Sequence, residues 1–128
     1  MDPETFFEEM PFASLLGIDV TSCADGHAAG RLELREELSW NADRPVAHGG
    51  VTFTLADTVG GAALVSLVER PVPTIDMRID YLAAGTGDLR AEADVVRLGD
   101  DVGTVDVSVF AVEDDTHVAD ARGVYKTG

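Results

Sequence analysis

The sequence predicts an α+β domain in which one antiparallel sheet of about six strands wraps around a single long central helix. Residues 51–68 form one long apolar segment, which indicates the helix. Later segments alternate apolar and charged residues, as half-buried strands do, and the short connections between them favour antiparallel pairing. With 128 residues, no internal repeat and no low-complexity segment, the chain has the pattern of a single domain over residues 1–128.

The first part of the chain predicts two short helical turns and then a hairpin. Apolar residues and glutamates mix between residues 5 and 16, and Pro11 interrupts them, so two turns are expected in place of one helix. Residues 18–22 alternate in polarity, Asp25-Gly26 is a turn signal, and residues 30–38 alternate again. That pattern is typical of two paired strands joined by a tight turn.

The long apolar segment and the strands after it complete the predicted domain. Its 18 residues approach the length of a membrane span, but Asp57 lies inside it and no Lys or Arg cluster flanks it. A buried core helix is therefore the better interpretation. The strands that follow are expected at residues 75–81, 88–98, 103–112 and 117–126, with Gly-rich or Asp-rich turns between them.

The charge of the chain excludes two classes of partner. Acidic residues outnumber basic ones 24 to 9, and such a surface repels nucleic acid phosphates and anionic membrane leaflets. Eight of the nine basic residues are Arg and Asp outnumbers Glu 15 to 9, which favours a halophilic protein, because molar salt screens like charges within about 3 Å. The single Cys23 and the absence of a secretory pattern at the N-terminus predict a cytoplasmic location.

Four small or polar residues fall in one narrow stripe of the predicted helix at 100° per residue: Gly50, Thr54, Asp57 and Gly61. The larger apolar residues occupy the opposite side: Leu55, Ala56, Val59, Ala62, Ala63 and Leu67. The stripe allows another backbone or a ligand to approach closely. Asp57 in its middle is a candidate catalytic carboxylate. The structural alternative is an Asp57 that bonds a neighbouring Thr hydroxyl or caps a partner element.

The run His48-Gly49-Gly50 precedes the first turn of this helix, where unpaired N–H groups and the positive end of the helix dipole converge. A substrate carbonyl aimed at the Gly50 N–H would be polarised there, and the two glycines leave room for it. The alternative is an ordinary loop-to-helix turn with His48 at the surface.

The spacing of these groups predicts a shared site. His48 and Asp57 are nine residues apart, which is roughly 13 Å along a helix, so one chain cannot bring both to one carbonyl. If both are catalytic, the site pairs Gly50 of one subunit with Asp57 of another in a two-fold dimer.

The remaining candidates are weaker. His27, His117 and Cys23 have no partners at metal-ligand spacing, so they are interpreted as structural and no metal site is expected. The sequence contains no GxxxxGK, GxGxxG or GxSxG motif, which argues against phosphate-loop, dinucleotide and serine hydrolase sites.

The string HGGVTFTLADTVGGAAL, residues 48–64, resembles the signature of the hotdog-fold thioesterases of the PaaI (phenylacetate-pathway) type. An Asn-containing loop before the HGG and a strand beginning at Thr74 also follow the family order, so the resemblance covers residues 12–126. It implies a hotdog fold and hydrolysis of acyl-coenzyme A to free acid and coenzyme A, with no metal or bound cofactor. It also implies sites shared within a homodimer, commonly paired into a dimer of dimers.

The resemblance implies a role for each matching residue. Asp57 is expected as nucleophile or general base, the Gly50 N–H as the donor that polarises the carbonyl, and His48 as support at that end. Asn41 resembles the loop Asn that positions the thioester or water, and Thr74 stands where the family has Ser or Thr beside the carboxylate. Three further residues are expected to line the substrate site: Gly49, Thr54 and Gly61.

Two departures from the family pattern concern substrate contacts. The loop between Asn41 and His48 is one residue longer than is usual in the family, which argues against Asn41 reaching the site. Ala83-Ala84 replaces an Arg-Pro pair, which removes a cationic contact near the substrate entrance. The basic residues left as candidates for the phosphates of coenzyme A are Arg70, Arg78, Arg90, Arg97 and Lys126.

Two alternative functions fit the same fold. The first is a non-catalytic protein that binds acyl-CoA or a small aromatic molecule, and the presence of Asp57 in the small-residue stripe argues against it. The second is a hydratase acting on an enoyl-CoA, which would need Asp and His at short spacing in one chain. The nine-residue spacing does not supply that arrangement.

Overall fold

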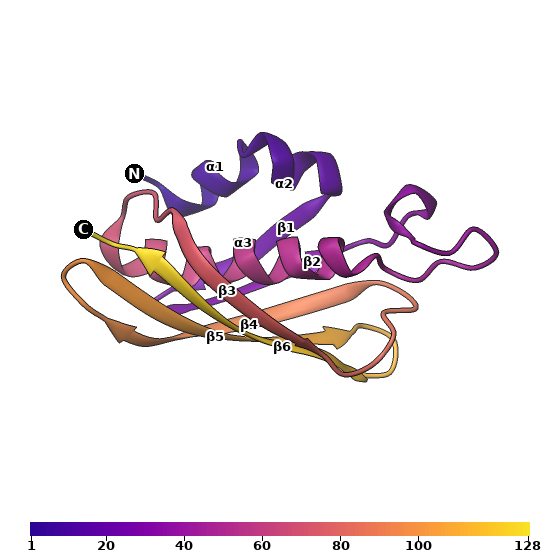
Figure 1. Ribbon diagram of the computed structural model, residues 1–128. Helices are drawn as coiled ribbons and strands as arrows, with labels where there is room; N and C mark the ends of the chain where they lie inside the picture. Colours follow the sequence, from indigo (N-terminus) through magenta and orange to yellow (C-terminus); the bar gives the residue numbers. More distant parts are fainter.

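One antiparallel sheet curves around the long helix α3 (Gly49–Val68) in a computed structural model that describes residues 1–128 (Figure 1). The six strands are β1 (Ile18–Ala24), β2 (His27–Leu32), β3 (Thr74–Tyr81), β4 (Leu89–Leu98), β5 (Val102–Ala111) and β6 (His117–Lys126). The predicted α+β architecture, with about six antiparallel strands around one central helix, is confirmed.

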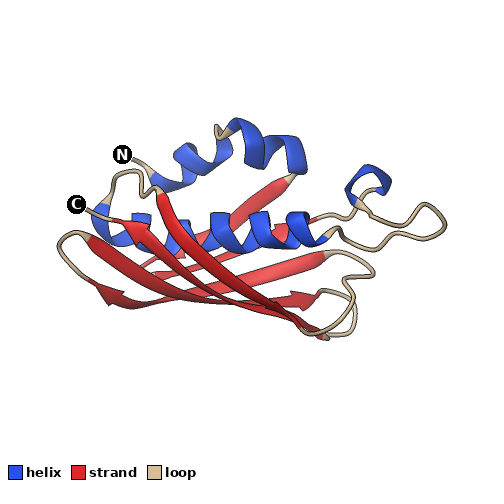
Figure 2. Cartoon of the chain, viewed as in Figure 1, coloured by secondary structure: helices blue, strands red, loops and turns tan.

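The two predicted helical turns are α1 (Pro3–Glu8) and α2 (Pro11–Leu16). Each has a proline in its first turn, where the missing N–H costs no helical hydrogen bond. Gly17 ends α2 with a φ of 77°, a left-handed conformation that glycine adopts without strain. Figure 2 shows both short helices on the side of α3 opposite the sheet, so that α3 lies between two layers.

The strand order is β1-β2-β4-β5-β6-β3, which places β3 at the sheet edge beside β6. The short connection from β3 to β4 is therefore not a hairpin, although it is rich in turn residues. The predicted second strand at residues 30–38 needs correction at both ends. β2 begins at His27 and ends at Leu32, because its partner β1 begins at Ile18, opposite Leu32, and residues 36–38 form a 3-10 turn.

The core lies between α3 and the concave face of the sheet. The predicted apolar side of α3 is fully buried at Leu55, Ala56, Val59, Ala62 and Ala63. Leu67 is the exception, because it lies near the end of the helix and is 42% exposed. α3 is long and apolar enough to span a membrane, but 67% of its most apolar window is buried inside the domain. The prediction of a core helix is confirmed.

The edge strand β3 is covered less well than the other strands. Its apolar residues alternate as predicted, yet Ile75 is 56% exposed and Tyr81 is 52% exposed. Most of the contact between α3 and the sheet involves β1, β2, β4 and β5. The β3 edge therefore offers free backbone hydrogen-bonding groups beside exposed apolar side chains.

Candidate active site

Asp57 lies in the middle of α3, beside the first residue of β3. The Thr74 Oγ1 donates a hydrogen bond to Asp57 Oδ1 at 2.7 Å. The Asp57 side chain is half-buried, and the other carboxylate oxygen, Oδ2, accepts no hydrogen bond from the protein. The structure thus brings together the predicted pair of Asp57 and Thr74, and it leaves one carboxylate oxygen available to a substrate or water.

Tyr125 of β6 holds this part of α3 in place. β3 and β6 pair so that Thr74 lies opposite Tyr125, and the Tyr125 hydroxyl donates to the backbone carbonyl of Asp57 at 2.8 Å. Burial raises the pKa of Tyr125, and the nearby charge of Asp57 raises it further, so the hydroxyl stays protonated and remains a donor. A Cβ on Gly60 would lie 2.6 Å from this hydroxyl, so the close approach requires glycine there.

A pocket of about 240 Å³ opens beside the Asp57 carboxylate. Its lining is mainly apolar and comes from α1, α3, the end of β6 and the connection between α3 and β3. The lining residues are Phe6, Phe7, Met10, Asp57, Thr58, Gly61, Val65, Pro71, Val72, Pro73, Thr74 and Tyr125. An apolar pocket with a few convergent polar groups is the usual form of a small-molecule site.

The other predicted group lies at the N-terminus of α3. The His48 Nδ1 caps the helix by accepting a hydrogen bond from the Gly50 N–H at 2.8 Å. This bond requires a lone pair on Nδ1, so His48 is unprotonated at that nitrogen. The Gly50 N–H, which the sequence indicated as unpaired, is therefore occupied in the single chain. A ligand oxygen would have to replace the histidine ring.

Tyr81 fixes the peptide group that carries this N–H. Its hydroxyl donates to the Gly49 carbonyl at 2.6 Å, and its ring lies against the glycine, since a Cβ there would be 3.3 Å from the ring. Burial raises the pKa of Tyr81, which keeps its hydroxyl a donor. The Gly49 carbonyl and the Gly50 N–H belong to one peptide unit, so a hydrogen bond to the carbonyl polarises the N–H.

The two groups remain apart in one chain. Gly50 and Asp57 are seven residues apart on α3, a separation of roughly 10 Å. Thr54 lies between them and donates its hydroxyl to the Gly50 carbonyl at 2.8 Å. Asn41 lies in the loop before α3, where its Oδ1 accepts the N–H groups of Asp43 and Arg44 at 2.8 and 3.4 Å. These bonds are typical of a turn residue, and the role of Asn41 in positioning the thioester or water stays a prediction.

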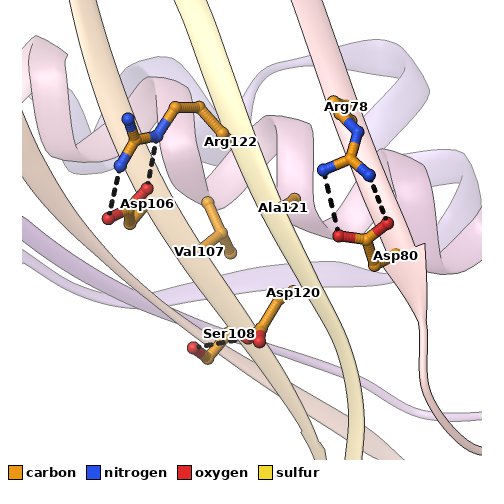
Figure 3. A pocket seen from close by; sticks show the side chains of 8 residues that line it. All are labelled: Arg78, Asp80, Asp106, Val107, Ser108, Asp120, Ala121 and Arg122. Carbon is orange, nitrogen blue, oxygen red and sulfur yellow. Dashed lines mark hydrogen bonds and ion pairs between the residues drawn. The ribbon is translucent and has the colours of Figure 1, made fainter.

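A larger pocket, of about 360 Å³, lies on the outer face of the sheet; it contains Arg78, a candidate for phosphate binding, and none of the predicted catalytic residues. Figure 3 shows that its arginines are bound within it. Arg122 bonds Asp106 at 2.7 and 3.0 Å, and Arg78 bonds Asp80 at 3.1 and 3.0 Å. Each arginine is thus paired with one aspartate, and the third aspartate, Asp120, bonds Ser108. No group of three or more His, Cys, Asp and Glu side chains is placed to hold a metal ion.

Pairing with other groups also reduces the set of basic residues that are candidates for phosphate binding. Arg78 is paired with Asp80, Arg90 bonds both Glu92 and Asp115, and Arg70 donates to the carbonyl of Thr127. Arg97 and Lys126, both exposed, have neither an ion pair nor a side-chain hydrogen bond. Lys126 directly follows Tyr125, a residue of the pocket beside Asp57.

Sequence reasoning missed three contributors to these groups. Tyr125 was one residue of a predicted strand, and the alternation of that strand would have placed it on the inner face. Tyr81 ended another predicted strand, and no sequence signal links it to Gly49. Phe6 and its neighbours in α1 were assigned only to helical turns. Their contact with the pocket depends on how α1 folds over α3, which short-range periodicity does not specify.

The chain is similar to a known protein family and to several of its members. The profile of the Thioesterase superfamily matches residues 45–117, which include α3 with both groups and extend through β3, β4 and β5. A Halobacterium salinarum protein whose name classes it provisionally as an esterase is 35% identical, over 96% of this chain and 88% of its own length. The medium/long-chain acyl-CoA thioesterase YigI of Salmonella typhimurium is 27% identical, over 98% of this chain and 90% of its own.

The solved structures show the same relationship. The PaaI protein from the phenylacetic acid degradation operon of Escherichia coli superimposes with a TM-score of 0.86 at 28% identity, covering 97% of this chain and 88% of that one. The shared architecture is the six-stranded antiparallel sheet around one long helix. On the fold, the family profile and these relatives, the chain belongs to the thioesterase superfamily of the hotdog fold.

Proposed function

We propose that this protein hydrolyses acyl-CoA thioesters, with Asp57 as the catalytic carboxylate. The observation that carries the proposal is the Asp57–Thr74 pair at the mouth of an apolar pocket, with Asp57 Oδ2 free. The family profile and the similarity to YigI support a thioesterase of this superfamily.

Thioester hydrolysis requires two groups, a hydrogen-bond donor to the carbonyl oxygen and a carboxylate. A thioester carbonyl is already electrophilic, so a hydrogen-bond donor that stabilises its oxyanion is sufficient activation. Asp57 then acts in one of two ways. As a general base it takes a proton from the attacking water, and as a nucleophile it forms an anhydride that water hydrolyses. Both routes break the C–S bond, release the acid, and return a proton to the departing thiolate of coenzyme A.

We assign the donor to the Gly50 N–H of a second subunit. Within one chain this N–H lies roughly 10 Å along α3 from Asp57, too far to share one carbonyl. A two-fold dimer supplies two equivalent sites, each with Asp57 from one subunit and Gly50 from the other. The open β3 edge and its exposed Ile75 and Tyr81 support an interface on that side of the domain.

In this mechanism His48 occupies the Gly50 N–H before the substrate binds. Its ring holds the Gly50 N–H in a hydrogen bond until the thioester oxygen replaces it. The exchange preserves the number of hydrogen bonds, because the Gly50 N–H gives up one acceptor, the imidazole nitrogen, and gains another, the thioester oxygen. That oxygen becomes negative as the reaction proceeds. The Tyr81 hydroxyl keeps the Gly49–Gly50 peptide oriented during the exchange.

The test is release of free thiol from straight-chain and aryl acyl-CoA substrates in molar potassium chloride, comparing wild type with Asp57→Asn. The amide oxygen of the substituted side chain can still accept the Thr74 hydrogen bond, so the fold of the site is preserved. We expect a loss of about 10²- to 10⁴-fold in kcat, the range of a general acid–base group. The matched control is Asp94→Asn, which removes an exposed carboxylate on the outer sheet face that bonds His27.

Two outcomes would contradict the proposal. Unchanged turnover in Asp57→Asn would exclude Asp57 as the catalytic carboxylate. A folded wild-type dimer that cleaves no substrate of the panel would instead favour the non-catalytic acyl-CoA-binding protein, which mass spectrometry of bound ligands would then identify.

A further inference from the structure

We propose that the pocket beside Asp57 binds the acyl group, and that α1 limits this group to about ten carbons. The inference rests on the proposed thioesterase function, because it takes Asp57 as the carboxylate next to the reacting carbonyl. It adds the substrate class, acyl groups of medium length, and the residues that set the limit.

The polar groups of the pocket are concentrated in one part of it. Asp57 and Thr74 are hydrogen-bonded to each other at 2.7 Å, while α1 and the connection between α3 and β3 contribute mainly apolar residues. A ligand that fits this distribution is apolar along its length and carries one reactive polar end. An acyl thioester has that form, with its carbonyl near Asp57 and its hydrocarbon chain toward α1.

The volume of the pocket sets the size of the acyl group. An apolar cavity of about 150 Å³ holds one benzene molecule, which is about 25 Å³ for each carbon. On that scale the 240 Å³ pocket accommodates about nine or ten carbons. Acyl groups from octanoyl to decanoyl therefore fill it, and shorter groups leave part of its apolar surface in contact with water.

Phe6 lines the pocket from α1 and lies at the margin of the core. Its ring is half-buried and contacts the ring of Phe7 edge to face, with centroids 5.1 Å apart. Phe7 itself is 6% exposed and belongs to the core cluster. Truncating Phe6 therefore enlarges the pocket on the α1 side, whereas truncating Phe7 removes core packing.

Gly61 offers the opposite change. It lines the pocket from α3, and a Cβ there would lie 3.5 Å from the Tyr125 ring and 3.8 Å from Val72. Both are ordinary van der Waals distances, so alanine fits without displacing a neighbour. Gly61→Ala adds one methyl group to the pocket wall and also favours the helix.

The experiment measures kcat/KM for straight-chain acyl-CoA substrates from four to sixteen carbons. In the wild type we expect the maximum at eight to ten carbons. Phe6→Ala should shift the maximum by two to four carbons and raise the ratio of the fourteen-carbon to the eight-carbon substrate at least tenfold. Gly61→Ala should lower kcat/KM for the ten-carbon substrate about tenfold and change the four-carbon substrate less than threefold.

The matched control is Phe12→Ala, which truncates a phenylalanine of α2 that is 57% exposed and does not line the pocket. Its chain-length profile should parallel that of the wild type. If Phe6→Ala and Gly61→Ala also parallel the wild type while Asp57→Asn is inactive, the acyl pocket is overturned and the thioesterase function stands.

A second measurement separates the two proposals. The affinity of each variant for decyl-CoA, a thioether that cannot be hydrolysed, is determined by calorimetry. Gly61→Ala should weaken it about tenfold, and Phe12→Ala should leave it unchanged. If no thioester is cleaved but this affinity depends on residues 6 and 61, the pocket stands and the thioesterase function fails. Equal affinity in all variants overturns the pocket.

Discussion

The first turn of α3 and its middle carry the two halves of the proposed site, and they are built in opposite ways. At the first turn, His48 and Gly50 are exposed, and the Gly50 N–H and the Gly49 carbonyl are both bonded to neighbouring side chains. In the middle, Asp57 is half-buried, faces an apolar pocket and keeps one oxygen free. The first turn thus carries an N–H donor that is already hydrogen-bonded. The middle of the helix carries a carboxylate oxygen that has no partner and lies beside an apolar pocket.

The two halves lie on one helix, and the helix keeps them apart. A rigid helix fixes the separation of its residues at about 1.5 Å per residue, so Gly50 and Asp57 cannot approach each other by any side-chain motion. The same rigidity keeps each half in a fixed position, so that a second subunit can present the complementary half to it. The comparison can be tested by removing each half in turn.

Beyond the loss of Asp57 itself, the largest effect is expected from Gly50→Pro, which deletes the donor N–H. Proline is tolerated in the first turn of a helix, so α3 should still form. We expect kcat to fall about 10²- to 10³-fold, the usual result of losing one oxyanion donor. The measurement is steady-state hydrolysis of a decanoyl thioester, with thermal unfolding to verify the fold.

Gly50→Ala is the matched control for that variant. It retains the N–H, and the added Cβ would meet only the His48 ring, at 3.1 Å. Activity within threefold of wild type is expected for alanine. Equal losses in the alanine and proline variants would show that the side-chain position matters and the N–H does not.

A smaller effect is expected from Thr74→Val, which removes the hydroxyl bonded to Asp57 and preserves the shape of the side chain. Hydrogen bonds to charged groups contribute about 1.5–3 kcal/mol, so kcat/KM should fall at least tenfold. Thr74→Ser keeps the hydroxyl and should stay within threefold of wild type. Two variants with the same kinetics would contradict a role for the hydroxyl in orienting Asp57.

The smallest effect is expected from Tyr81→Phe, which removes the hydrogen bond to the Gly49 carbonyl and keeps the ring against the glycine. One neutral hydrogen bond contributes about 0.5–1.5 kcal/mol, which corresponds to a two- to tenfold change. If Tyr81 orients the Gly49–Gly50 peptide for the transition state, kcat should fall while KM stays constant. A change in KM alone would indicate that Tyr81 contacts the substrate directly.

Periodicity predicted most of the fold because each element carries its own pattern. The apolar run that forms α3 and the alternation that forms β3 to β6 both depend on near neighbours in the sequence. The strand order does not, since β3 joins β6 across the sheet and not the strand that follows it. The end of β2 at Leu32 was also missed, because it is set by where the partner strand begins.

The site residues likewise divide into those that the sequence indicated and those contacts that depend on tertiary structure. The helical stripe located Asp57, and the resemblance to the family added Thr74, whose bond to Asp57 depends on one tertiary contact. The resemblance also indicated Asn41, but local hydrogen bonds hold its side chain within its own loop. That the Gly50 N–H is bonded to His48 depends on the rotamer of one side chain, which sequence patterns do not encode.

The central claim is that a working site combines the Gly50 end of one subunit with the Asp57 carboxylate of another. Heterodimers of a Gly50→Pro chain and an Asp57→Ala chain, isolated with two different tags, test it most directly. Each variant alone should be inactive, and each heterodimer should contain one intact and one doubly damaged site, with about half the wild-type activity. Heterodimers as inactive as the two parent variants would contradict the shared site.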